Sequence, residues 1–131
     1  MIERILDAIA AGLRTIAGLR VFDFMPDTIS PPAAIVQLPR TINFDLTFGR
    51  GSDALVIPVL VVVAKVSERA AYNSLAAYLN LDGPTSVKQA LDGNLGGVVD
   101  DAHVVRATGI GSYSIGGIDY MGCLFEVNII A

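Results

Sequence analysis

Residues 41–63 read TINFDLTFGRGSDALVIPVLVVV, and this stretch is the most informative about the fold. From Thr41 to Phe48 apolar and polar residues alternate, as in a β-strand with one apolar and one polar face. Gly49-Arg50-Gly51-Ser52 supplies turn residues, and Leu55 to Val63 is apolar on both faces of a second strand. The stretch therefore predicts a long β-hairpin. Pro58 should lie at a bulge or an unpaired edge, because proline has no backbone N–H.

The residues before this hairpin predict one helix and two short strands. Apolar residues recur at spacings of three and four from Ile2 to Ile16, which predicts an amphipathic helix over 2–17 that Gly18 ends. Leu19 to Phe22 and Ala34 to Leu38 are strand candidates, and the segment between them is rich in proline.

The residues after the hairpin predict two more helices and a closing pair of strands. Ser67 suits the N-cap of a helix that ends near Leu79, and Ser86 with Gln89 forms a capping-box pattern for a short helix that Gly93 ends. The closing strands are expected at about Val98–Thr108 and Ile118–Ile130, joined by a glycine-rich turn over Gly109–Gly117.

This order of elements predicts an α+β fold in a single domain over residues 1–131. The sheet should be mainly antiparallel and contain a long β-hairpin, because the strands cluster in hairpins. Two main helices and one short helix should flank the sheet on one side.

The composition indicates that apolar surface is buried against other molecules. Hydrophobic residues make up 53% of the 131 residues and charged residues only 17%, although a domain this small leaves much of its surface in water. A membrane is not the expected destination: the longest apolar run, Ala54–Ala64, is well short of the roughly twenty residues of a spanning helix. Glu3, Arg4 and Asp7 also interrupt any signal-peptide core. Contact between subunits is the better explanation.

The sequence offers no pattern for catalysis, for a metal or for a cofactor. His103 is the only histidine and Cys123 the only cysteine, so one chain cannot supply a zinc ligand set or an internal disulfide. Cys123 lies in phase with apolar strand residues, where cysteine behaves as a small hydrophobe. Asp100 and Asp101 are neighbours in sequence, but their side chains should point to opposite faces of a strand. We therefore predict that the chain is not an enzyme.

The net charge of −4 and the scattered basic residues also disfavour a nucleic-acid-binding module. The lone cysteine fits assembly inside a cell.

The segment best suited to a partner is the hairpin Thr41–Leu60. One face presents Phe44, Leu46 and Phe48, and the tip carries Arg50 and Asp53 between glycines. The aromatic face either covers the domain's own core or packs against a neighbouring subunit, and the sequence leaves both interpretations open.

In layout the chain resembles the tail terminator proteins of long-tailed phages, also described as tail completion or head–tail joining proteins. The features that carry this resemblance span nearly the whole chain. They are the opening helix, the strand Pro32-Ala33-Ala34-Ile35-Val36, the run Arg50-Gly51-Ser52-Asp53 before Ile57-Pro58-Val59-Leu60-Val61, the helix ending Tyr78-Leu79, and Ser86-Val87-Lys88-Gln89-Ala90-Leu91 before the last hairpin.

The resemblance implies a structural virion protein of the tail or neck, assembled in the host cytoplasm. It would form a homo-oligomeric ring, usually sixfold, that caps the tail tube, joins the head–tail connector and lets DNA pass without specific binding. Phe44, Leu46, Phe48, Arg50 and Asp53 would then contact a neighbouring subunit or the connector. The acidic residues Asp45, Asp100 and Asp101 are expected to face the channel, where negative charge keeps DNA from adhering.

Two other classes remain open. One is a different neck or tail-tube component of the same virion. The other is a small oligomeric ligand-binding or regulatory domain, which would need a pocket lined by convergent polar groups.

Overall fold

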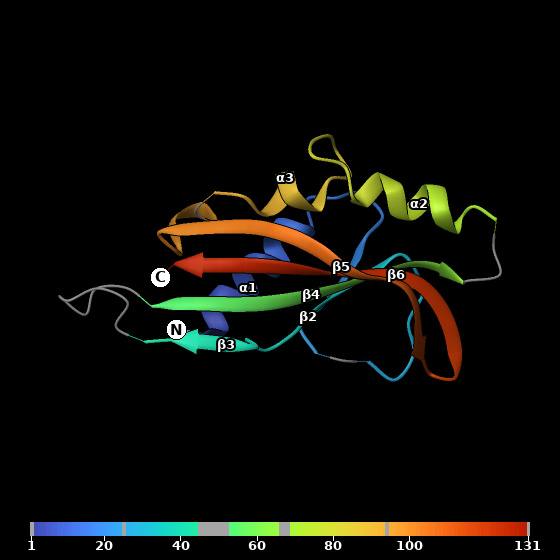
Figure 1. The fold of residues 1–131 in the computed structure, drawn as a ribbon, viewed down its shortest axis with the longest axis horizontal. Coiled ribbons are helices and arrows are strands. Elements are labelled where there is room, and N and C mark those ends of the chain that lie inside the picture. Colours follow the sequence, from blue (N-terminus) through green and yellow to red (C-terminus); the bar gives the residue numbers. More distant parts are fainter. Residues whose placement is uncertain (1, 25, 45–52, 66–68, 94, 131) are drawn as a thin grey trace.

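The computed structural model describes residues 2–24, 26–44, 53–65, 69–93 and 95–130. It confirms the predicted α+β class: a six-stranded, mostly antiparallel sheet has three α-helices packed alongside it (Figure 1).

The helices and strands alternate in blocks along the chain. The helices are α1 (Ile2–Leu13), α2 (Ala71–Tyr78), α3 (Val87–Leu91) and the single 3-10 turn η1 (Leu95–Gly97). The strands are β1 (Arg20–Phe22), β2 (Ala33–Val36), β3 (Thr41–Asn43), β4 (Ala54–Lys65), β5 (Asp101–Ile115) and β6 (Ile118–Ile130).

The sheet has the order β1-β2-β4-β6-β5, and β3 pairs with β4 next to the part of β4 that binds β2. Only β1 and β2 are parallel. The long strand β4 is central, and β5 forms the edge opposite to β1 and β3. The sheet therefore has two different edges: β1 and β3 lie toward one edge, and β5 forms the other.

Pro58 lies in the central strand, at a position where no neighbouring strand needs a hydrogen bond from its missing N–H. Its carbonyl accepts a hydrogen bond of 3.1 Å from the N–H of Gln37, on the side of β4 where the chain crosses from β2 to β3. In an antiparallel pair the N and the carbonyl of one residue face the same neighbour. The proline nitrogen thus faces residues 37–40, which belong to no strand. The prediction of a bulge or an unpaired edge was wrong, because β4 is a central strand and its register shift lies between Val62 and Ala64.

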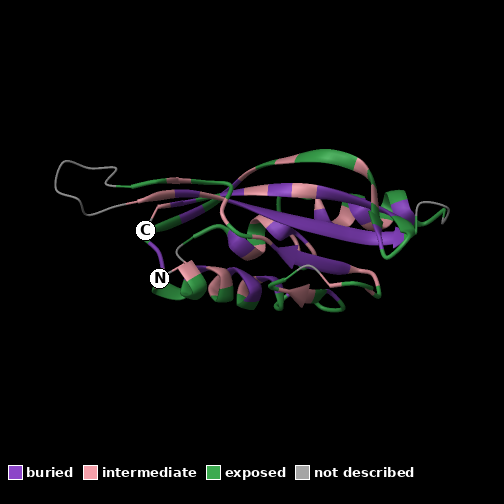
Figure 2. Ribbon diagram, turned by 90° about the horizontal axis from the view of Figure 1, so that it is seen from below, coloured by how far each residue is buried: buried purple, intermediate pink, exposed green. Residues whose placement is uncertain are grey.

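The main core lies between the helices and one face of the sheet. Buried apolar residues of all three α-helices pack there against alternate residues of β4 and β6, among them Ile57, Val59, Cys123 and Val127. A smaller core on the opposite face contains Ile35, Leu60 and Tyr120 and no helical residue. The predicted placement of the helices on one side is therefore confirmed. Figure 2 shows the buried residues concentrated along the middle of the sheet.

Two predicted helix boundaries were wrong. Helix α1 ends at Leu13 rather than at 17, because the following hydrogen bonds join residues three apart instead of four. The Thr15 hydroxyl donates to the carbonyl of Gly12 at 2.6 Å, and the Ile16 N–H donates to the carbonyl of Leu13 at 3.0 Å. Helix α2 begins at Ala71 after Ala70, which makes no side-chain cap. The expected N-cap, Ser67, lies outside the described residues.

The predicted glycine-rich turn over Gly109–Gly117 was also wrong. Strand β5 continues to Ile115, and the turn to β6 is confined to Gly116 and Gly117. Gly109, with φ of 58°, lies instead at a register shift inside the strand, where the Tyr113 hydroxyl donates to its carbonyl at 2.6 Å. The longest hairpin of the described structure is therefore the closing one, β5–β6.

Candidate functional site

The predicted contact residues on the first hairpin are described only in part. Phe44, just beyond β3, is 71% exposed, so its ring does not cover the domain core. Ile42, two residues earlier, packs partly against the main core. Asp53 is half-buried, whereas Leu46, Phe48, Arg50 and the predicted channel residue Asp45 lie outside the described residues.

The other predicted channel residues, Asp100 and Asp101, are exposed at the start of β5. The register places Asn43, Ala54, Ile130 and Asp101 in one row across the sheet. The start of β5 and the end of β3 therefore share one end of the sheet, about 14 Å apart across three strand spacings. Of the predicted residues that the structure describes, Phe44 and Asp53 therefore lie at the same end of the sheet as Asp100 and Asp101.

The first residues of the β5 edge are covered by the segment that follows α3. Ala102 exchanges backbone hydrogen bonds with Gly93. The Val104 N–H donates to Asp92 Oδ1 at 2.9 Å, and Lys88 Nζ donates to the Val104 carbonyl at 3.1 Å. Lys88 Nζ also lies 2.8 Å from Asp92 Oδ2. We call Lys88, Asp92 and Val104 the edge clamp, because two side chains occupy the positions that an added strand would bind.

The interactions within the edge clamp favour the ionised form of Asp92. Partial burial acts to raise the pKa of Asp92, but the hydrogen bonds from Lys88 and from the Val104 N–H outweigh it and hold the pKa of Asp92 below its usual value. His103 Nδ1 lies 3.9 Å from the same carboxylate. Asp92 thus remains a carboxylate that accepts hydrogen bonds at neutral pH.

Beyond the edge clamp the sheet edge is open. Strand β5 binds β6 on one side, and within the described part of the chain no backbone group binds Val105–Ser112 from the other side. Two register shifts interrupt this edge, one between Val104 and Arg106 and one between Thr108 and Gly111, where the Tyr113 hydroxyl binds the Gly109 carbonyl.

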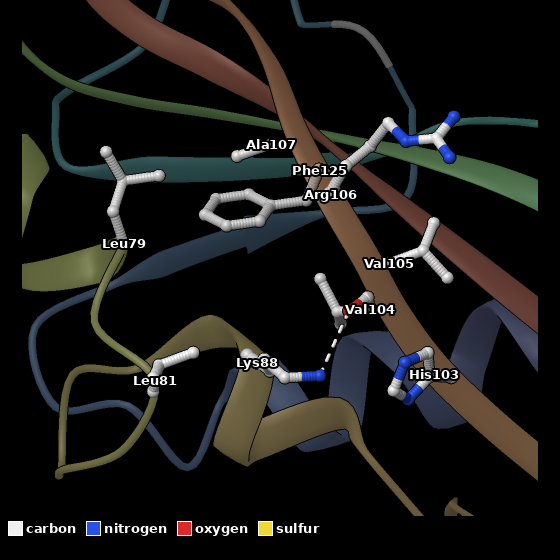
Figure 3. A pocket seen from close by; sticks show the side chains of 9 residues that line it. All are labelled: Leu79, Leu81, Lys88, His103, Val104, Val105, Arg106, Ala107 and Phe125. Carbon is white, nitrogen blue, oxygen red and sulfur yellow. Dashed lines mark hydrogen bonds between the residues drawn. The ribbon is translucent and has the colours of Figure 1, made fainter.

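A shallow groove of about 260 Å³ runs over this open edge (Figure 3). On one side of β5 lie the apolar side chains of Leu79, Leu81, Ala107 and Phe125 together with Lys88. On the other side of the strand lie His103, Val105 and Arg106. Arg106 pairs with Glu126 at 2.8 Å, yet its side chain remains 60% exposed. The groove therefore combines an apolar patch with the charged groups of Lys88 and Arg106, each of which is already paired with a carboxylate.

Large apolar side chains are exposed at both edges of the sheet. Phe24, Leu38 and Phe44 lie on the segments around β1 and β3, and Leu81 and Ile110 lie at the β5 edge. Tyr72 on α2 and Ile118 at the last turn are exposed as well.

Nothing described points to covalent or metal chemistry. Cys123 is fully buried, and burial raises the pKa of its thiol to about 12, which is the opposite of an activated nucleophile. Among the residues that the structure describes, no three His, Cys, Asp or Glu side chains gather into a metal-binding group. Within the same part of the chain, every helix is too short or too polar to cross a bilayer.

The sequence pointed to Phe44, which is exposed, but not to the groove. Its lining comes from separate parts of the chain, between Leu79 and Phe125, and no local pattern joins them.

Comparison with protein-family models and with curated proteins gives no match to this chain.

Proposed function

We propose that this chain is a structural virion protein of a long-tailed phage, which forms a ring that caps the tail tube and joins it to the head connector. The observation that carries the proposal is the exposure of large apolar side chains along both opposite edges of one small sheet, with Phe44 on one edge and Leu81 and Ile110 on the other. Exposed apolar surface gathered at the edges of a small sheet marks a contact surface or an aggregation hazard.

The two edges suit a ring better than a twofold dimer. A twofold interface uses the same surface patch on both subunits, whereas a ring uses two different patches that meet head to tail. Here one edge offers a short strand with a projecting aromatic residue, and the other offers a groove. Such unlike surfaces favour cyclic assembly, and the resemblance to tail terminator proteins supplies its context.

The exposed carboxylates Asp100 and Asp101 support a channel of negative charge in the proposed ring. Repulsion between carboxylates and phosphates keeps passing DNA from adhering, since nucleic-acid affinity comes mainly from clustered basic residues. Changing both residues to Asn should leave particle assembly intact and slow DNA release. DNA release at the same rate as from unaltered particles would contradict the proposed role of Asp100 and Asp101.

The location of the chain on virions tests the proposed function directly. Particles produced from the encoding genome should contain the chain, and an antibody against it should label the junction between head and tail. Label spread along the tail would support the alternative of a tube component. Absence of the chain from purified particles would contradict any virion role.

A further inference from the structure

We infer that the edge of β5 is built to prevent pairing with an added strand, so that a partner can bind this edge only through side chains. Strand β5 is 15 residues long and forms an edge of the sheet. Edge strands of this length are ordinarily templates for pairing with other chains, and proteins protect them by specific means. The inference concerns a single copy of the chain and does not depend on the proposed function.

The start of the edge cannot pair because its outward backbone groups are already bound. Ala102 exchanges hydrogen bonds with Gly93 through both its N–H and its carbonyl. In the edge clamp, Asp92 accepts from the Val104 N–H at 2.9 Å and Lys88 donates to the Val104 carbonyl at 3.1 Å. An approaching strand would have to displace two charged side chains that also bind each other.

Two register shifts interrupt the middle of the edge. Between the first shift, at Val104/Arg106, and the second, at Thr108/Gly111, only Arg106–Thr108 keep a regular register. An added strand needs evenly spaced donors and acceptors, whereas a bulge breaks this spacing and increases the local twist. The side chain of Arg106, 60% exposed, adds a charge to the same short stretch. Bulges and charged side chains are common protections of edge strands.

The second shift is held by a side chain of the same strand. Gly109 has a φ of 58°, and its carbonyl accepts a hydrogen bond from the Tyr113 hydroxyl at 2.6 Å. A Cβ at position 109 would lie 2.5 Å from that hydroxyl oxygen, so the contact requires glycine. The carbonyl of Gly109 is therefore occupied, and the next residue, Ile110, exposes its side chain instead.

The last part of the edge runs beside the loop between β1 and β2. The closing hairpin curls so that the end of β5 reaches this loop (Figure 1). Pro26 and Asp27 of the loop line the same hollow as Tyr113 and Ser114. A Cβ at Gly116 would lie 2.7 Å from the Asp27 carbonyl oxygen, so the loop and the turn are in close contact. The loop thus restricts the approach of a strand to the end of β5.

Side chains are what this edge leaves exposed for a partner. Leu81 and Ile110 are 78% and 59% exposed there. Any extended segment can supply the backbone hydrogen bonds of strand addition, whereas contact through side chains depends on the shape and polarity of the partner. The protected edge therefore favours a specific partner over indiscriminate strand pairing.

A double variant opens the edge. Asp92→Ala frees the Val104 N–H, and Tyr113→Phe frees the Gly109 carbonyl. Gly122→Ala is the matched control, because it should lower stability by overpacking inside the sheet and leaves the protecting groups in place. Lys88→Ala with Tyr113→Phe is a second, milder opened variant that keeps the hydrogen bond to Asp92. Circular dichroism and urea unfolding show that each chain folds and compare their stabilities.

Thioflavin T fluorescence and sedimentation of the folded chains then measure the growth of strand-paired aggregates. We expect the opened variants to form them at least about tenfold faster than Gly122→Ala, because freed backbone donors and acceptors can pair with another chain. The unaltered chain should form none. Hydrogen exchange followed by mass spectrometry should show slower exchange over residues 104–112 in the aggregates than in the monomer.

Three outcomes would overturn the inference. Opened variants that aggregate no faster than Gly122→Ala would show that these groups do not protect the edge. Faster aggregation without slower exchange over residues 104–112 would place the pairing elsewhere in the chain. Thioflavin-positive aggregates of the unaltered chain with slower exchange over the same residues would show that its edge accepts a strand. None of these results would contradict the proposed function, which antibody labelling of particles tests independently.

Discussion

The backbone N–H of Val104 donates a hydrogen bond of 2.9 Å to the carboxylate of Asp92, which joins the end of α3 to the exposed edge of β5. Lys88 completes the edge clamp from the preceding helical turn. These contacts hold α3 against the sheet and cover the start of the β5 edge, where Lys88 and Val104 also line the groove.

Asp92→Ala should lower the free energy of unfolding by about 1–2 kcal/mol, since it removes a charge-assisted hydrogen bond from a half-exposed site. Asp92→Asn keeps an acceptor for Val104 but no charge, so its loss should be smaller. Urea denaturation at pH 7 measures both, and a loss in Asp92→Ala with none in Asp92→Asn would contradict a role for the charge.

The contribution of Asp92 should also depend on pH. Its pKa is lowered in the folded chain, so the carboxylate stabilises the fold fully above its unfolded pKa, and this contribution is lost as the pH falls through the lower folded pKa. The stability difference between the unaltered chain and Asp92→Asn should therefore be constant near neutral pH and shrink below about pH 4. A difference that grows on acidification would contradict this sign.

Ser86 should be among the most sensitive polar positions. Its side chain is almost fully buried, accepts from the Gln89 N–H at 3.1 Å and donates to the Asn80 carbonyl at 2.6 Å. Ser86→Ala removes the N-cap of α3 and leaves both groups without this partner, for a loss of about 2 kcal/mol. Ser114→Ala, on the exposed side of β5, is the control and should change stability by no more than about 0.5 kcal/mol. Thermal unfolding of the two variants compares them.

Gly122 in β6 leaves no room for a side chain. A Cβ there would collide with the carbonyl of Val61 and lie 2.8 Å from Cγ1 of Val62. Gly122→Ala should therefore cost about 1–3 kcal/mol through overpacking. Its cross-strand neighbour Gly111 has open space around it, so Gly111→Ala should be neutral or slightly stabilising. Similar midpoints of urea unfolding for both variants would show that β4 and β6 are not so closely packed.

Cys123 should be inert in the folded chain. With a thiol pKa of about 12, only about one thiol in ten thousand is ionised at pH 8, and the sulfur has no access to solvent. A disulfide reagent followed by absorbance should label the chain only on unfolding. Rapid labelling of the native chain would contradict the burial of β6.

Local patterns predicted those elements whose signals lie within one segment. The apolar stripe from Ile2 located α1, Ser86 located α3, and the doubly apolar run Leu55–Val63 located the central strand. The capping box was confirmed only in part: Ser86 accepts from the Gln89 N–H, whereas the Gln89 side chain accepts from the Gly83 N–H at 2.7 Å.

The predictions from sequence failed where contacts between residues far apart in the chain determine the structure. Gly109 has the appearance of a turn residue, yet β6 continues to pair with β5 past it and the Tyr113 hydroxyl binds the Gly109 carbonyl. The groove is a further case, since Leu81 and Phe125 lie far apart in the sequence and meet only because α2 packs beside the last strands.

Sedimentation velocity of the unaltered chain over a wide range of concentration tests most directly whether the exposed sheet edges bind sister subunits. We predict that the 13.8 kDa monomer gives way, as concentration rises, to one assembly of fixed mass that is a whole-number multiple of the monomer. A single 13.8 kDa species at every concentration would contradict self-assembly through these edges.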